Sequence, residues 1–94
     1  MNNDKEVKVY WQPGCSSCLK TKEFLMDNGI PFKSVNVLED KTGFEDLQRF
    51  GVKMVPIVAK GDAWANGAVF RDVAEVAGFD YQTHKMLEPS IMKD

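Results

Sequence analysis

The segment Pro13-Gly14-Cys15-Ser16-Ser17-Cys18 carries most of the information about fold and function. It holds both cysteines of the 94-residue chain, follows an apolar run and begins what we interpret as a helix. Two cysteines three residues apart at a helix start can close a disulfide across one helical turn. The segment therefore indicates a redox-active pair of thiols.

The sequence on both sides of this segment alternates between strand and helix patterns. The patterns predict strands over 7–11, 32–37, 54–59 and 63–65, and helices over 15–28, 42–50, 70–77 and 80–87. Thr42 and Glu45 have the spacing of a capping box, which predicts Thr42 as the N-cap of the second helix.

This order, β-α-β-α-β-β-α plus a short C-terminal helix, predicts an α/β fold with a small four-stranded mixed sheet flanked by helices. It is the architecture expected of a thioredoxin-like domain. We expect one domain over residues 1–94, with a core at about 7–78 and a C-terminal extension over 79–94.

Composition and charge exclude several classes of function. The formal net charge is -2 and acidic and basic residues are interleaved, so no basic surface for nucleic acid is predicted. No apolar run reaches the roughly 18 residues of a membrane span, and the polar start of the chain does not have the order of a signal peptide. We therefore expect a cytoplasmic monomer that contacts neither nucleic acid nor membrane.

The two cysteines are expected to have different roles, because the thiolate is the attacking species and an ordinary thiol has a pKa of about 8.5. Cys15 precedes the helix, where unpaired backbone N–H groups and the positive end of the helix dipole stabilise a thiolate. Cys18 lies one turn inside the helix, and Lys20 and Lys22 add positive potential nearby. We therefore predict Cys15 as the nucleophile and Cys18 as the resolving thiol.

Half of a zinc site would show the same cysteine spacing. A structural zinc ion needs four ligands, and beyond the cysteines the chain offers one histidine, His84, which is not at ligand spacing. We therefore expect no metal site and no tightly bound cofactor.

The chain resembles the glutaredoxin family over about residues 7–78, at Trp11–Lys22, Asn28–Phe32, Gly51-Val52 and Val55-Pro56. The helix start matches the family pattern C-x-x-C-x-K-[AT]-K residue for residue. The resemblance implies a thioredoxin-like fold and a thiol–disulfide oxidoreductase, an electron carrier that reduces disulfides of proteins or mixed disulfides with glutathione. Its electron donor would be glutathione, as a co-substrate, or thioredoxin reductase.

The resemblance also implies a substrate surface around the cysteines. In the family, the proline matching Pro56 is cis and lies against the cysteines, and the preceding residue, here Val55, offers its backbone to the sulfur-bearing part of a bound thiol. The alternatives are a trans Pro56 that begins an edge strand and a Trp64 that serves as a packing anchor. The remaining implied substrate or glutathione contacts are Trp11, Gln12, Gly14, Lys20, Trp64 and Asp72.

Several positions differ from glutathione-using members of the family. Gln12 stands where they usually have Lys or Arg, Met54 replaces a Thr, and Ser16-Ser17 replaces a proline and an aromatic residue. A neutral residue at Gln12 removes a charge-assisted partner for a glutathione carboxylate, a loss of about 1–3 kcal/mol. The pattern Gly61-Asp62…Trp64…Gly67 is more similar to glutaredoxin-like proteins that accept electrons from thioredoxin reductase and pass them to ribonucleotide reductase.

Two other functions are consistent with a glutaredoxin fold. Some members hold a [2Fe–2S] cluster between two subunits through the first cysteine and glutathione, and Ser16 is more permissive of this than a proline. The chain could also be a redox-inert interaction module of a larger protein.

Overall fold

Within residues 6–80, which the computed structural model describes, the elements follow one another in the predicted order. They are β1 (Val7–Trp11), α1 (Ser16–Asp27), β2 (Lys33–Asn36), α2 (Lys41–Phe50), β3 (Ile57–Lys60), β4 (Ala63–Asn66) and α3 (Phe70–Ala77). The predicted last helix, over 80–87, lies outside the described residues apart from its first. The single domain with its extension over 79–94 stays a prediction.

The strands form one mixed sheet in the order β2-β1-β3-β4. β1 pairs with β2 in parallel, whereas the β1–β3 and β3–β4 pairs are antiparallel. The parallel pair follows from α1, because a strand that returns through a helix re-enters the sheet in the same direction. The predicted four-stranded thioredoxin-like fold is therefore confirmed.

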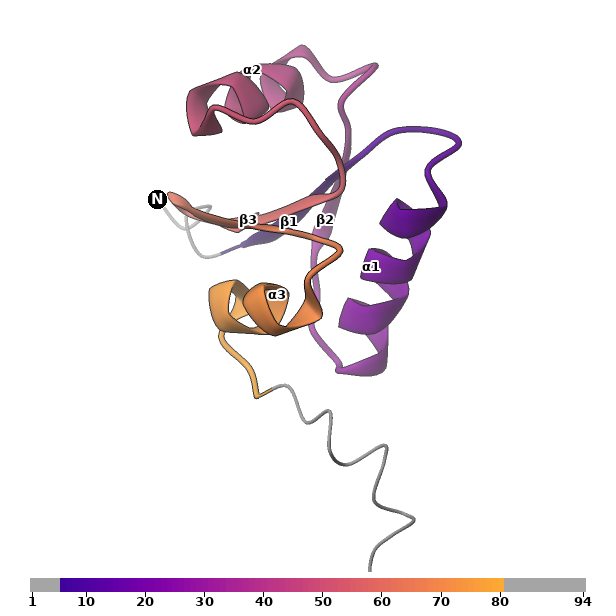
Figure 1. Cartoon of the computed structure of the whole chain (residues 1–94), viewed down its shortest axis with the longest axis vertical. Helices are drawn as coiled ribbons and strands as arrows, with labels where there is room; N and C mark the ends of the chain where they lie inside the picture. Colours follow the sequence, from indigo (N-terminus) through magenta and orange to yellow (C-terminus); the bar gives the residue numbers. More distant parts are fainter. Residues whose placement is uncertain (1–5, 81–94) are drawn as a thin grey trace, which may run out of the picture.

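Alternate side chains of β1 build two separate core clusters. Val9 packs with Leu25 of α1 and Val73 of α3, and all three are fully buried. On the opposite face of the sheet, Tyr10 packs with Leu47 of α2. Accordingly, α2 lies on one side of the sheet and α3 on the other (Figure 1). Because both faces of β1 are packed against helices, the end of β1 is fixed in place, and the cysteine segment continues from it.

Two contacts hold α2 close to the sheet. The hydroxyl of Tyr10 donates a hydrogen bond of 2.8 Å to Oδ2 of Asp46, and burial, together with this bond, raises the pKa of Tyr10 above its ordinary value. Gly43 allows a close approach to β2, because a Cβ at this position would overlap Cγ1 of Val35.

No helix within the described part of the chain is long and apolar enough to cross a membrane.

The predicted strand over 54–59 is wrong at its beginning. β3 starts at Ile57, and the three residues before it run outside the ladder. Pro56 has no backbone N–H, so it cannot donate to a neighbouring strand. Met54 and Val55 consequently have their backbone outside the sheet.

The predicted N-cap of the second helix is also wrong. Asp40, rather than Thr42, has the extended backbone of a cap (φ -104°, ψ 105°), and its Oδ1 accepts a hydrogen bond of 3.1 Å from the N–H of Gly43. Thr42 lies inside the helix. Aspartate is among the preferred N-cap residues, and its charge also interacts favourably with the positive end of the helix dipole.

The cap assignment predicts different effects for two neighbouring substitutions. Asp40→Ala should lower the free energy of unfolding by about 1 kcal/mol, because it leaves the N–H of Gly43 without its acceptor. Thr42→Ala should change it by less than about 0.5 kcal/mol, since it removes an exposed side chain from the first turn. Urea unfolding of the oxidised protein, followed by circular dichroism, measures both. A larger loss in Thr42→Ala than in Asp40→Ala would contradict the assignment.

Candidate functional site

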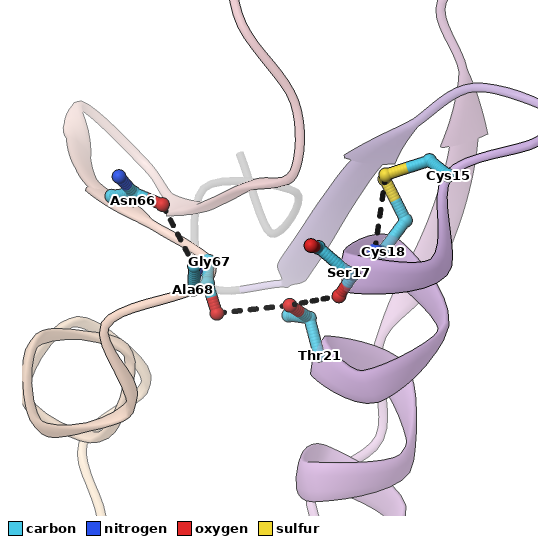
Figure 2. The surroundings of a disulfide bond; sticks show 7 residues. All are labelled: Cys15, Ser17, Cys18, Thr21, Asn66, Gly67 and Ala68. Carbon is cyan, nitrogen blue, oxygen red and sulfur yellow. Dashed lines mark hydrogen bonds between the residues drawn. A yellow bond between two sulfur atoms is a disulfide. The ribbon is translucent and has the colours of Figure 1, made fainter.

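The cysteine pair lies where β1 leads into α1. Cys15 and Cys18 form a disulfide, with their Cα atoms 5.3 Å apart (Figure 2). Cys15 is the N-cap of α1, and its Sγ accepts a hydrogen bond of 3.1 Å from the backbone N–H of Cys18. Cys15 is half-buried, whereas Cys18 is 1% exposed. A molecule arriving from solvent can therefore reach Cys15 more readily than Cys18.

The start of α1 provides positive potential at the first cysteine. Backbone N–H groups of the first helical turn have no partner inside the helix, and they point toward the N-cap. The first turn of α1 contains no acidic residue that would oppose this potential. In the reduced protein, the same N–H groups and the helix dipole favour a thiolate at Cys15 over one at Cys18.

Trp11 at the end of β1 and Lys22 of α1 contact each other. The ammonium of Lys22 lies 3.8 Å from the centroid of the Trp11 ring, a cation–π contact, and partial burial lowers the pKa of Lys22. The indole N–H of Trp11 is buried and has no hydrogen-bond partner among residues 6–80. Trp11 is therefore half-buried beneath a lysine, and its contact with substrate stays a prediction.

The peptide bond between Val55 and Pro56 is cis, as the family resemblance implies, so the trans alternative is wrong. Pro56 is buried, and Gly67 lies directly against it. The N–H of Gly67 donates a hydrogen bond of 2.8 Å to the carbonyl of Pro56, and a Cβ on Gly67 would lie 2.9 Å from Cβ of Pro56. Gly67 therefore cannot carry a side chain without displacing Pro56.

A cavity of about 790 Å³ lies next to Val55 and includes Gln12 in its lining. Its other wall comes from α2 and the segments that flank it, where Leu38 and Phe44 are 68% and 51% exposed. Among the residues that line this cavity, Lys53 is the one with a charged side chain. The structure thus brings Gln12 and Val55 to one mostly apolar groove.

The α2 wall of this groove is not among the predicted site residues. The structure leaves half of the surface of Phe44 exposed at the groove. The clearest signal of an apolar groove in the sequence is Met54, which lines it. Met54 is an apolar residue two positions before Pro56, where the family has a Thr.

Two of the predicted contacts lie elsewhere. Trp64 stacks on Phe50 of α2, with ring centroids 6.0 Å apart, and it does not line the groove. This contact favours the packing-anchor interpretation of Trp64. Asp72 lies in the first turn of α3, where its Oδ1 is 3.8 Å from Nε of Arg71.

The other two predicted contacts are exposed near the cysteines. Gly14 precedes Cys15 with φ 82°, a left-handed conformation that favours glycine. Lys20 is exposed on α1.

Among residues 6–80 there is no group of three or more histidine, cysteine or acidic side chains that could hold a metal ion.

Comparisons with known proteins give consistent matches. The sequence model of the Glutaredoxin family matches residues 7–64, which include the disulfide and Pro56. N-acetyl-S-hydroxy-L-cysteine reductase of Bacillus subtilis (strain 168) is 30% identical over 77 residues, which are 81% of this chain and 78% of the relative. Glutaredoxin-like protein NrdH of Lactococcus lactis subsp. cremoris is 27% identical over 71 residues, 76% of this chain and 99% of the relative.

The solved structure of the glutaredoxin-like protein NrdH-redoxin from Escherichia coli has a similar fold. It superposes with a TM-score of 0.68 at 24% sequence identity, over 76% of this chain and 93% of that protein. That structure is described as a basis for a thioredoxin-like activity profile.

Proposed function

The chain belongs to the glutaredoxin family, and on that premise we propose that it is a dithiol thiol–disulfide oxidoreductase with Cys15 as the nucleophile and Cys18 as the resolving thiol. One observation carries the assignment of roles. The half-buried Cys15 caps α1 and accepts the N–H of the shielded Cys18, so the reachable sulfur is also the one that the helix start stabilises as a thiolate.

The proposed reaction has two exchange steps. The thiolate of Cys15 attacks one sulfur of a substrate disulfide, forms a mixed disulfide with it and releases the other substrate sulfur as a thiolate. The thiolate of Cys18 then attacks the sulfur of Cys15 and releases the first substrate thiol. The substrate gains two electrons and the protein loses two, ending with the Cys15–Cys18 disulfide. A shielded Cys18 supports this order, because it is close to Cys15 and remote from solvent.

The groove beside Val55 is evidence that a segment of the substrate binds alongside Pro56. Among the described residues, the backbone N–H and C=O of Val55 have no hydrogen-bond partner. An extended peptide could pair with them, as a strand does with a free sheet edge. The apolar wall formed by Met54 and Phe44 would then bury a side chain that neighbours the target cysteine.

We further propose that thioredoxin reductase, rather than glutathione, supplies the electrons. Glutathione carries two carboxylates, and the neutral side chain of Gln12 offers neither of them an ion pair. The match to the glutaredoxin-like protein NrdH of Lactococcus lactis supports this choice. Both donors belong to reducing compartments, so we assign the activity to the cytoplasm.

A small oxidised thiol is a second candidate substrate. The Bacillus subtilis relative is named for the reduction of an S-hydroxy cysteine derivative, and a cavity of about 790 Å³ is large enough for a molecule of that size. With such a substrate, the thiolate of Cys15 would attack the S-hydroxy sulfur and break its S–O bond. The departing hydroxide would take up a proton and become water, and Cys18 would then resolve the mixed disulfide.

The proposal predicts turnover that depends on the first cysteine. With NADPH and thioredoxin reductase, the protein should reduce insulin disulfides, measured as NADPH oxidation, and Cys15→Ser should abolish the activity. With glutathione and glutathione reductase the rate should be lower. An absence of turnover with both donors, for a protein whose thiols are shown to be reduced, would refute the proposal and favour the redox-inert or iron–sulfur alternative.

Gln12→Lys should improve the use of glutathione. It restores a cation that a glutathione carboxylate can pair with, so glutathione-dependent turnover should rise by roughly 10- to 100-fold at subsaturating glutathione. Gln12→Met, which has similar length and no charge, is the control and should not raise it. Equal glutathione-dependent rates in the wild type and Gln12→Lys would show that Gln12 does not determine the donor.

A further inference from the structure

We infer that Thr21 is a positioning residue for the proposed disulfide exchange, because its hydroxyl links the cysteine-bearing start of α1 to the loop that holds Pro56. The inference rests on the proposed function and adds a residue that has neither a sulfur nor a contact with substrate. Its starting point is an anomaly of the core. Apart from Tyr10, Thr21 is the one described residue whose buried side chain carries a hydroxyl, and it is 0% exposed.

The hydroxyl of Thr21 lies between two backbone carbonyls. Oγ1 is 3.0 Å from the carbonyl oxygen of Ser17 and 2.9 Å from that of Gly67 (Figure 2). A threonine hydroxyl has one proton, so it shares or alternates its donation between the two. The contact with Ser17 is the common one within a helix. The contact with Gly67 joins segments 46 residues apart, and local helix structure does not explain it.

Gly67 passes this contact on to Pro56. Its carbonyl accepts from Thr21, while its N–H donates to the carbonyl of Pro56 at 2.8 Å. Its lack of a side chain lets the two backbones approach, since a Cβ would lie 2.9 Å from Cβ of Pro56. The loop is also held from within, because Oδ1 of Asn66 accepts from the N–H of Ala68 at 2.9 Å (Figure 2).

This chain of contacts connects the two halves of the proposed site. Cys15 belongs to the start of α1, and Val55-Pro56 belongs to the segment before β3. A substrate that reacts with Cys15 while pairing with Val55 requires a fixed separation between these halves. The Thr21–Gly67–Pro56 contacts provide one, and reactions between bound groups depend strongly on such positioning.

Thr21→Val and Thr21→Ser test the inference. Valine keeps the shape and loses the hydroxyl, whereas serine keeps the hydroxyl. Each variant is reduced beforehand with dithiothreitol, so that no electron donor is needed. Two rates are then measured: reduction of a peptide disulfide in a single turnover, and alkylation of Cys15 by iodoacetamide, which requires no contact with Val55 or Pro56.

Thr21→Val should slow disulfide reduction by roughly 10- to 100-fold, because the two halves of the site are no longer held together. Its alkylation rate and the pH dependence of that rate should match the wild type. Thr21→Ser should recover most of the disulfide reduction. A role limited to overall stability would leave both rates unchanged in the folded protein, and a role in activating Cys15 would lower both. Either result would overturn the inference.

Gly67→Ala tests the same contacts from the other side and serves if Thr21→Val does not fold. It keeps the hydroxyl of Thr21 and displaces Pro56, so the same selective loss of disulfide reduction is expected. Undiminished disulfide reduction by folded Gly67→Ala would count against the inference. A wild-type protein that reduces no disulfide would remove the proposed function itself, and that result is seen before any variant is compared.

Discussion

The hydrogen bond from the N–H of Cys18 to Sγ of Cys15, 3.1 Å long, is the interaction on which the site depends. It makes one sulfur the cap of α1 and leaves the other inside the helix, so two chemically identical residues become different. The remaining architecture supports this arrangement. Val9 of β1 and Leu25 of α1 pack in one buried cluster, which fixes the direction in which the helix leaves the sheet.

The other half of the site comes from a distant part of the chain. Pro56 has no backbone N–H to donate to the neighbouring strand, so β3 begins only after it, at Ile57. Val55 therefore lies at the groove with unpaired backbone groups. Thr21 and Gly67 connect this segment to α1 through buried hydrogen bonds. The site is therefore assembled from a helix start and a strand start, which are local features that the core and one hydroxyl hold together.

Local signals were sufficient for the order of elements and for the cysteine pair. A cysteine at a helix start predicts structure within a few residues, and this is confirmed at Cys15, which caps α1. The capping-box spacing predicted the wrong cap for the second helix, because the helix begins one residue before Thr42 and Asp40 caps it. Contacts between distant segments, such as Thr21 with Gly67 and the exposed face of Phe44 at the groove, depend on tertiary packing and have no local signature.

The central claim is that the helix start makes Cys15 the reactive thiol. Its most direct test is the rate of iodoacetamide alkylation of the fully reduced protein as a function of pH, with each cysteine followed separately by mass spectrometry. The account predicts that Cys15 is modified first, with a midpoint below the free-thiol pKa of about 8.5, so that its rate persists as the pH is lowered toward neutrality. A midpoint for Cys15 at or above about 8.5, or earlier modification of Cys18, would contradict it.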